Sequence, residues 1–131
     1  MKTVTLGSKN FKEYISSPEI QKRSEERGEE LSRDLKDENP LFIGVMNGAF
    51  RFASDLFTHM DIDCAIDFVK LSSYRGTSSS GQISEGAILK SDVSNRTIVI
   101  LEDIVDTGNT FEFLMTRFNQ LKVKDVRIAS L

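Results

Sequence analysis

Three carboxylates lie within five residues of one another, directly after an apolar stretch: Glu102, Asp103 and Asp106. Acidic side chains that crowd together repel one another unless a cation or hydroxyl groups lie between them. A sugar diol that donates hydrogen bonds to Glu102 and Asp103 would satisfy the pair. Mg²⁺, which prefers carboxylate and water oxygens, would also satisfy it. The alternative is an N-cap aspartate next to two solvated acids on a loop.

The residues around the third acid have the properties of a phosphate site. Gly108 permits a backbone conformation that other residues resist, so successive amides of residues 106–110 can point toward one ligand. The hydroxyls of Thr107 and Thr110 add hydrogen-bond donors. A helix that begins here would add partial positive charge.

This segment differs from a P-loop at two decisive positions. Asn109 stands where a P-loop needs lysine, and Asp103 stands where it needs its first glycine. A triphosphate is therefore a poor match. The segment predicts a monophosphate that is bound by amides and hydroxyls.

A sheet must position these side chains. Continuous apolar runs predict strands that are buried on both faces, and apolar residues at helical spacing follow them. Strands that alternate with helices indicate a parallel α/β sheet, in which ligands bind at the carboxyl ends of the strands. The strands are expected at residues 41–46, 62–71, 97–101 and 125–131, and the helices at 49–60 and 111–121.

The N-terminal part of the chain predicts an exposed helix at about residues 18–38. Pro18 suits its first turn, and Asn39-Pro40 ends it. Gly28 weakens this helix by about 1 kcal/mol relative to alanine. We find no domain linker, so residues 1–131 are expected to form one domain, with its core at about 41–131.

Residues 72–84 are rich in Ser, Gly and Thr. We expect them to form a polar loop, since they offer little to a core. Such a loop is either a surface excursion or a lid over an active site.

Composition excludes several classes of protein. With 17 basic and 20 acidic residues in 131, the formal charge is −3, which argues against broad binding to nucleic acid or to an anionic membrane. A single cysteine, Cys64, excludes an internal disulfide framework. Apolar runs are too short for a transmembrane helix, and the N-terminus does not resemble a signal peptide. We therefore expect a cytoplasmic protein without nucleic-acid or membrane partners.

The acidic segment resembles a known motif. Residues 98–110 are similar to the phosphoribosyl-pyrophosphate (PRPP) motif of type I phosphoribosyltransferases: an apolar strand, two acids, two apolar residues and Asp-Thr-Gly-x-Thr. Within that family the chain resembles the hypoxanthine and hypoxanthine-guanine phosphoribosyltransferases. Residues 44–50 resemble their pyrophosphate loop, and 72–81 resemble their mobile lid, marked by Ser-Tyr.

The resemblance implies a role for each position. Glu102 and Asp103 would hold the ribose hydroxyls and lie near Mg²⁺, and Asp106 would be the general acid/base at N7 of the purine. Ser73 and Tyr74 would close over the pyrophosphate. The remaining positions would bind phosphate groups: Met46, Asn47 and Gly48 the pyrophosphate, through a loop that often contains a non-proline cis peptide, and Asp106, Thr107, Gly108, Asn109 and Thr110 the 5′-phosphate.

The resemblance also implies a fold and an activity. The fold would be a single-domain, parallel-sheet α/β phosphoribosyltransferase core flanked by helices, with its hood incomplete. The reaction would transfer phosphoribosyl from PRPP to a 6-oxopurine base, hypoxanthine or guanine. It would yield pyrophosphate and a nucleoside monophosphate, IMP or GMP, in purine salvage. A homo-oligomer, either a dimer or a tetramer, is expected.

Two departures from the family pattern leave alternatives open. Asn47 stands where many relatives have lysine, so charge assistance to pyrophosphate would be weaker. Relatives continue past the strand expected at 125–131 with residues that recognise the base, and these have no counterpart in this sequence. The alternatives are a PRPP- or nucleotide-binding protein without turnover, a fragment that assembles only with partners, and a transferase that prefers xanthine or guanine.

Overall fold

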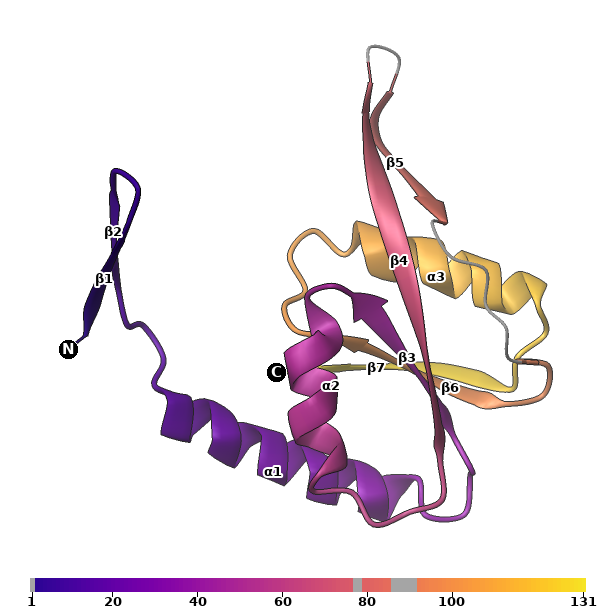
Figure 1. Cartoon of the computed structure of the whole chain (residues 1–131). Coiled ribbons are helices and arrows are strands. Elements are labelled where there is room, and N and C mark those ends of the chain that lie inside the picture. The colour runs from indigo at the N-terminus through magenta and orange to yellow at the C-terminus, as the bar shows by residue number, and fades with distance from the viewer. Residues whose placement is uncertain (1, 77–78, 86–91) are drawn as a thin grey trace.

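A computed structural model describes residues 2–76, 79–85 and 92–131, with side chains described for 2–71 and 92–131 (Figure 1). It consists of a twisted sheet with helices on both faces and a small hairpin that stands apart at the N-terminus. No helix in these ranges is long and apolar enough to cross a membrane.

The sheet has the strand order β5-β4-β3-β6-β7. Four of its strands are parallel, and β5 pairs antiparallel with β4 at one edge. The parallel α/β architecture predicted from the sequence is confirmed. The strands are β3 (Leu41–Met46), β4 (Ala65–Gly76), β5 (Ser79–Glu85), β6 (Thr97–Glu102) and β7 (Asp125–Ser130).

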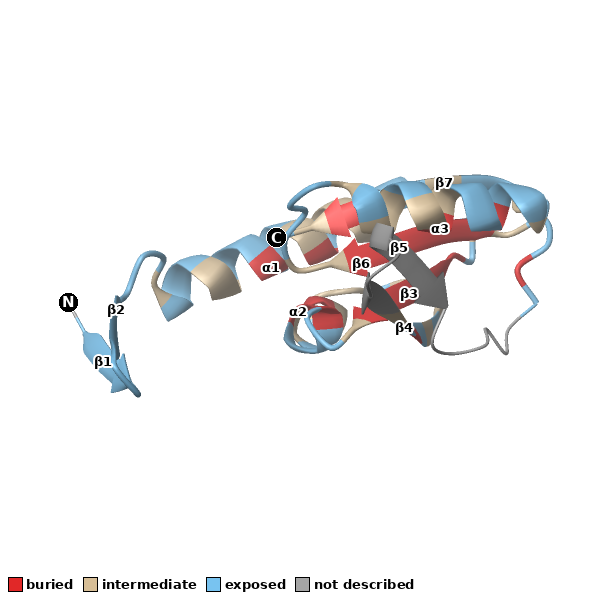
Figure 2. Ribbon diagram, turned by 90° about the horizontal axis from the view of Figure 1, so that it is seen from above, coloured by how far each residue is buried: buried red, intermediate tan, exposed pale blue. Residues whose placement is uncertain are grey.

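Helices cover the two faces of the sheet separately (Figure 2). α1 (Ser17–Asp34) and α2 (Ala49–Phe57) lie on one face, and α3 (Asn109–Gln120) lies on the other. Alternation along β3 supplies both cores: Phe42 packs in the α1–α2 cluster, and Ile43 packs in the α3 cluster. The apolar runs at β3 and β6 are therefore continuous because each strand is buried from both sides.

α1 begins with a capping box and ends earlier than the sequence suggested. Ser16 accepts a hydrogen bond from the Glu19 amide, and the Glu19 carboxylate accepts one from the Ser16 amide. Pro18 lies in the first turn, where its missing N–H has no cost. The helix ends at Asp34, and a turn occupies the remaining residues that were expected to be helical.

Gly28 has a packing role that its low helix propensity concealed. It is buried on α1, and a Cβ placed there would lie 2.7 Å from the Cβ of His59. His59 follows α2, which ends at Phe57 and not at residue 60. The glycine therefore permits close contact between α1 and the segment that leaves α2.

Residues 72–76 and 79–84 of the polar stretch are strand and not loop, which corrects the sequence prediction. β4 continues to Gly76, and β5 returns beside it, with a register shift between Tyr74 and Arg75. The start of β4 is also later than expected, at Ala65. Backbone pairing between two adjacent strands does not require apolar side chains, so a composition argument could not detect this hairpin.

A second hairpin at the N-terminus was not predicted. It pairs β1 (Thr3–Leu6) with β2 (Lys9–Lys12), and every residue of both strands is exposed. Gly7, with φ +63°, makes the turn between them. In Figures 1 and 2 this hairpin projects away from the body and joins it through α1.

Candidate functional site

The ends of β3 and β6 form the centre of the candidate site. The two strands pair in parallel, with Gly44 opposite Leu101, so the loops that follow them leave the same edge of the sheet. The Met46–Asn47 peptide bond is cis, the conformation that the resemblance implies for this loop. The candidate pyrophosphate loop and the acidic pair Glu102 and Asp103 are therefore neighbours.

Gly48 lies directly against the acidic pair. A Cβ at Gly48 would be 2.9 Å from Oδ1 of Asp103, closer than side-chain carbons come to oxygen. The same Oδ1 accepts a hydrogen bond from the Ile104 amide at 2.8 Å, and Ser130 Oγ donates to the Asp103 carbonyl at 3.3 Å. The Asp103 side chain is therefore held at the start of its own loop, where only glycine fits beside it.

Glu102, the last residue of β6, is half-buried. Burial raises the pKa of its carboxyl above the usual value, and the neighbouring charge of Asp103 raises it further. A hydroxyl donor or a cation that binds here would relieve both effects. The described residues contain no group of three or more His, Cys, Asp or Glu side chains able to hold a metal. Two adjacent carboxylates are chemically suited to a hydrated ion such as Mg²⁺, which keeps several water ligands.

The amino end of α3 forms the candidate phosphate cradle. Gly108 has φ +82°, a left-handed conformation that glycine adopts more readily than other residues, and the first helical hydrogen bond runs from Glu112 N to its carbonyl. Thr107 Oγ1 accepts a hydrogen bond from the Asn109 amide at 3.3 Å. No side chain in the described part of the chain caps the helix at Gly108. The amino end therefore offers amides and partial positive charge to an anion.

Asp106 lies between the acidic pair and this cradle. Its side chain is exposed, in the loop that joins β6 to α3. Ser73 and Tyr74 belong to β4, opposite Ile83 and Gln82 of β5, but their side chains lie outside the described residues.

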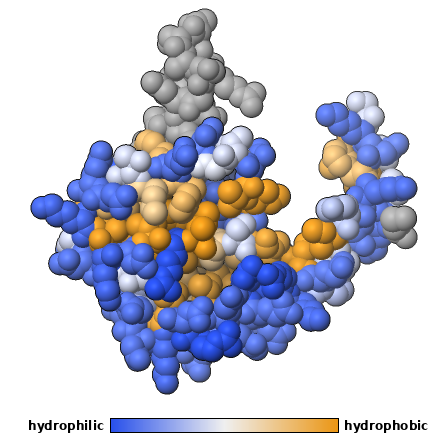
Figure 3. Space-filling model, turned by 180° about the vertical axis from the view of Figure 1, so that it is seen from behind, coloured by the Kyte–Doolittle hydropathy of each residue, from blue (hydrophilic) through white to orange (hydrophobic). Residues whose placement is uncertain are grey.

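An apolar pocket of about 430 Å³ adjoins the acidic pair, and sequence reasoning missed it. Its members come from separate parts of the chain, so no local pattern marks them. Figure 3 shows hydrophobic side chains gathered across the body and at the base of the N-terminal arm. The pocket is lined by Ile15, Ile20, Arg23, Asp103, Ile104 and Leu131.

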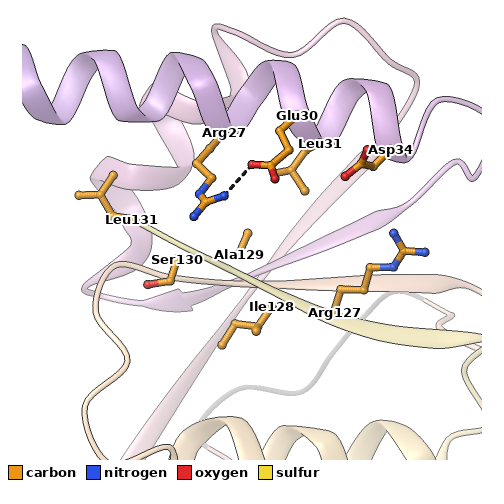
Figure 4. Close-up of a pocket in the computed structure, with 9 residues that line it drawn as sticks. All are labelled: Arg27, Glu30, Leu31, Asp34, Arg127, Ile128, Ala129, Ser130 and Leu131. Carbon is orange, nitrogen blue, oxygen red and sulfur yellow. Dashed lines mark hydrogen bonds and ion pairs between the residues drawn. The ribbon is translucent and has the colours of Figure 1, made fainter.

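A second cleft, of about 420 Å³, lies between α1 and β7 (Figure 4). Arg27 and Glu30 of α1 form an ion pair at its edge, with Nη1 and Oε2 2.6 Å apart. None of the residues predicted for the site lines this cleft. It nevertheless adjoins the site, because Leu131 lines both this cleft and the apolar pocket, and Ser130, which also lines the cleft, donates to the Asp103 carbonyl.

The sequence was also compared with known families. Residues 11–131 match the phosphoribosyl transferase domain, which is most of the chain. The chain belongs to this family. It is 38% identical over 117 residues to a hypoxanthine-guanine phosphoribosyltransferase of Streptococcus pyogenes. The aligned region covers 88% of the chain and 65% of that relative. It is 41% identical over 121 residues to the Bacillus subtilis protein of the same name, covering 92% of the chain and 67% of that relative.

Solved structures of this family have the same fold. A hypoxanthine phosphoribosyltransferase of Staphylococcus aureus superposes with a TM-score of 0.79 at 32% identity, covering 86% of the chain and 61% of that structure. A hypoxanthine-guanine phosphoribosyltransferase of Bacillus anthracis gives a TM-score of 0.81 at 30% identity, covering 90% of the chain and 68% of that structure. The chain thus spans about two thirds of the length of the relatives that it matches.

Proposed function

We propose that this chain transfers a 5-phosphoribosyl group from PRPP to a 6-oxopurine, hypoxanthine or guanine, and releases pyrophosphate. The observation that carries the proposal is the contact of Gly48 with Asp103, which joins the loop after β3 to the acids after β6. PRPP carries its pyrophosphate next to the ribose hydroxyls, so a site for it needs amide donors directly beside carboxylates. Relatives named as hypoxanthine-guanine phosphoribosyltransferases support the choice of base.

Each part of PRPP has a matching group in this arrangement. The hydroxyls of the ribose donate hydrogen bonds to Glu102 and Asp103. The 5′-phosphate binds at the amino end of α3, where Gly108 turns the backbone. Glu102 and Asp103 are the residues that would hold Mg²⁺, which would supply positive charge to the departing pyrophosphate.

In the reaction, N9 of the purine forms a bond to C1′ of the ribose. The bond from C1′ to the pyrophosphate oxygen breaks, and pyrophosphate takes the electron pair. Asp106, exposed next to the cradle, accepts the proton that the purine loses. Ser73 and Tyr74 close over the site and exclude water, which would otherwise capture the sugar cation.

The apolar pocket beside Asp103 gives the purine a surface. Ile104 is 73% exposed, and Ile15 is 52% exposed, so both offer apolar area to a flat base without a large rearrangement. Burial of that area would favour base binding.

We also propose that the chain forms a homo-oligomer. Phe50 of α2 and Ile66 and Phe68 of β4 are 60%, 41% and 38% exposed, and a contact between two copies of the chain would bury this apolar area. Size-exclusion chromatography with light scattering, which measures the molar mass of the protein in solution, tests this proposal. A monomer at micromolar concentration would contradict it.

Labelled hypoxanthine or guanine, incubated with PRPP and Mg²⁺, tests the transfer directly. We expect labelled IMP or GMP, and we expect Asp106→Asn to lower the rate at least tenfold through loss of the base. Calorimetry with PRPP and GMP distinguishes the alternative of binding without turnover. Absence of both product and binding would overturn the proposal. Parallel reactions with xanthine determine the base preference.

A further inference from the structure

Lys70 occupies a position that the motifs did not draw attention to. It lies in β4, and its Cα is the register partner of Met46, the residue directly before the cis peptide bond. β4 is the strand next to β3 at the carboxyl edge of the sheet. Lys70 is therefore the β4 residue nearest in register to the candidate pyrophosphate loop.

The side chain of Lys70 lies on the same face of the sheet as that loop. Val69 is buried in the cluster beneath α3, so the next residue along β4 points to the opposite face. Phe68 shares this opposite face, and its ring would be 2.7 Å from a Cβ built at Gly44. The chain turns toward the same face when it leaves Met46 and enters α2.

The charges around the loop leave it without a cation of its own. Asn47 is neutral, and the neighbouring acids after β6 are negative. Arg51, in the first turns of α2, is paired with Asp55, with Nε and Oδ2 3.2 Å apart. Lys70, by contrast, is exposed and forms no ion pair within the part of the chain that the structure describes.

We propose that Lys70 binds the pyrophosphate group and supplies, from β4, the positive charge that the loop after β3 lacks. This inference rests on the proposed function and adds a binding residue to it. The ammonium group on its four-carbon stem reaches from the strand toward the loop without a backbone change. A pyrophosphate held by the loop amides would thus meet a cation on the β4 side.

Calorimetry with inorganic pyrophosphate and Mg²⁺ at low ionic strength tests the inference. Lys70→Gln should weaken pyrophosphate binding roughly tenfold, the size expected for one charge acting across a few ångströms of water-exposed surface. Lys70→Arg should retain binding within about threefold because it keeps the charge. Added salt should reduce the difference in pyrophosphate affinity between wild type and Lys70→Gln, since salt screens the attraction between exposed charges.

Lys22→Gln is the matched control, because Lys22 is an exposed lysine of α1 away from the loop. GMP is the second probe, since its phosphate belongs at the amino end of α3, and Lys70→Gln should leave its affinity unchanged. Equal pyrophosphate affinity of wild type and Lys70→Gln, with GMP still bound, would overturn the role of Lys70 alone. Failure of the wild type to bind pyrophosphate and GMP would instead overturn the proposed function.

Discussion

The backbone of Gly48 lies against the carboxylate of Asp103, with room for a hydrogen atom but not for a methyl group. Two loops that are more than fifty residues apart in the sequence are thereby fixed to each other. The position of the candidate pyrophosphate loop consequently depends on the position of the acidic pair.

Gly48→Ala should separate these two loops. A Cβ 2.9 Å from Oδ1 forces either the loop or the Asp103 side chain to move. We expect pyrophosphate affinity to fall at least tenfold and the free energy of unfolding to fall by about 1–2 kcal/mol, as for other overpacking substitutions. Calorimetry and denaturant titration measure the two effects. Unchanged pyrophosphate affinity would contradict the contact.

Gly108→Ala should weaken the phosphate cradle. At φ +82° an alanine is strained, which costs about 1 kcal/mol of folding free energy. The relaxed backbone would also turn amides away from the ligand, so we expect weaker binding of GMP. Pyrophosphate binding at the other loop should change much less. Equal losses of affinity for GMP and for pyrophosphate would argue against separate subsites for the two groups.

Glu102→Gln should stabilise the free protein while it weakens PRPP binding. Because burial and Asp103 raise the pKa of Glu102, the folded state favours its protonated form, and ionisation costs stability as pH rises through that pKa. We expect a gain in the free energy of unfolding at pH 7, reduced by solvent screening because the side chain is partly exposed. Thermal melts of both proteins should converge at acidic pH, where wild-type Glu102 is protonated. A glutamine variant that is less stable at pH 7 would refute this account.

Gly28→Ala should destabilise the protein, although alanine favours helices. The added Cβ would lie 2.7 Å from His59 Cβ and 2.9 Å from its carbonyl oxygen, so α1 and the segment after α2 must separate. We expect a net loss of about 1–3 kcal/mol, because overpacking exceeds the gain in helix propensity. Glu29→Ala, at the exposed neighbouring position, serves as the control and should change stability little. A stabilised Gly28→Ala variant would contradict the packing.

Much of the fold could be predicted from the sequence because buried strands and helix faces consist of apolar residues in a recognisable local pattern. The strands β3 and β6 are continuous apolar runs, and α3 repeats apolar residues at helical spacing. The pairing of β4 with β5 beyond Leu71 could not be predicted in this way, because it depends on backbone hydrogen bonds between strands and most of the residues there are polar.

Part of the candidate site could also be predicted from local sequence, and part of it could not. The acids and Gly108 lie in one contiguous motif, so sequence spacing was enough to bring them together. The contact of Gly48 with Asp103, the apolar pocket and the register of Lys70 with Met46 each join distant segments. Such relationships depend on which strands pair and in what register, and no local pattern contains that information.

The N-terminal hairpin has a consequence for the way the molecule opens. All residues of β1 and β2 are exposed, and an isolated two-stranded hairpin is only marginally stable in water. Its amide hydrogens should therefore exchange with solvent through local fraying, whereas those of β3 should exchange only when the whole body unfolds. Amide exchange would then occur by local fraying in the hairpin and by global unfolding in the sheet. A protease would cleave the segment that precedes α1 much earlier than it cleaves the sheet.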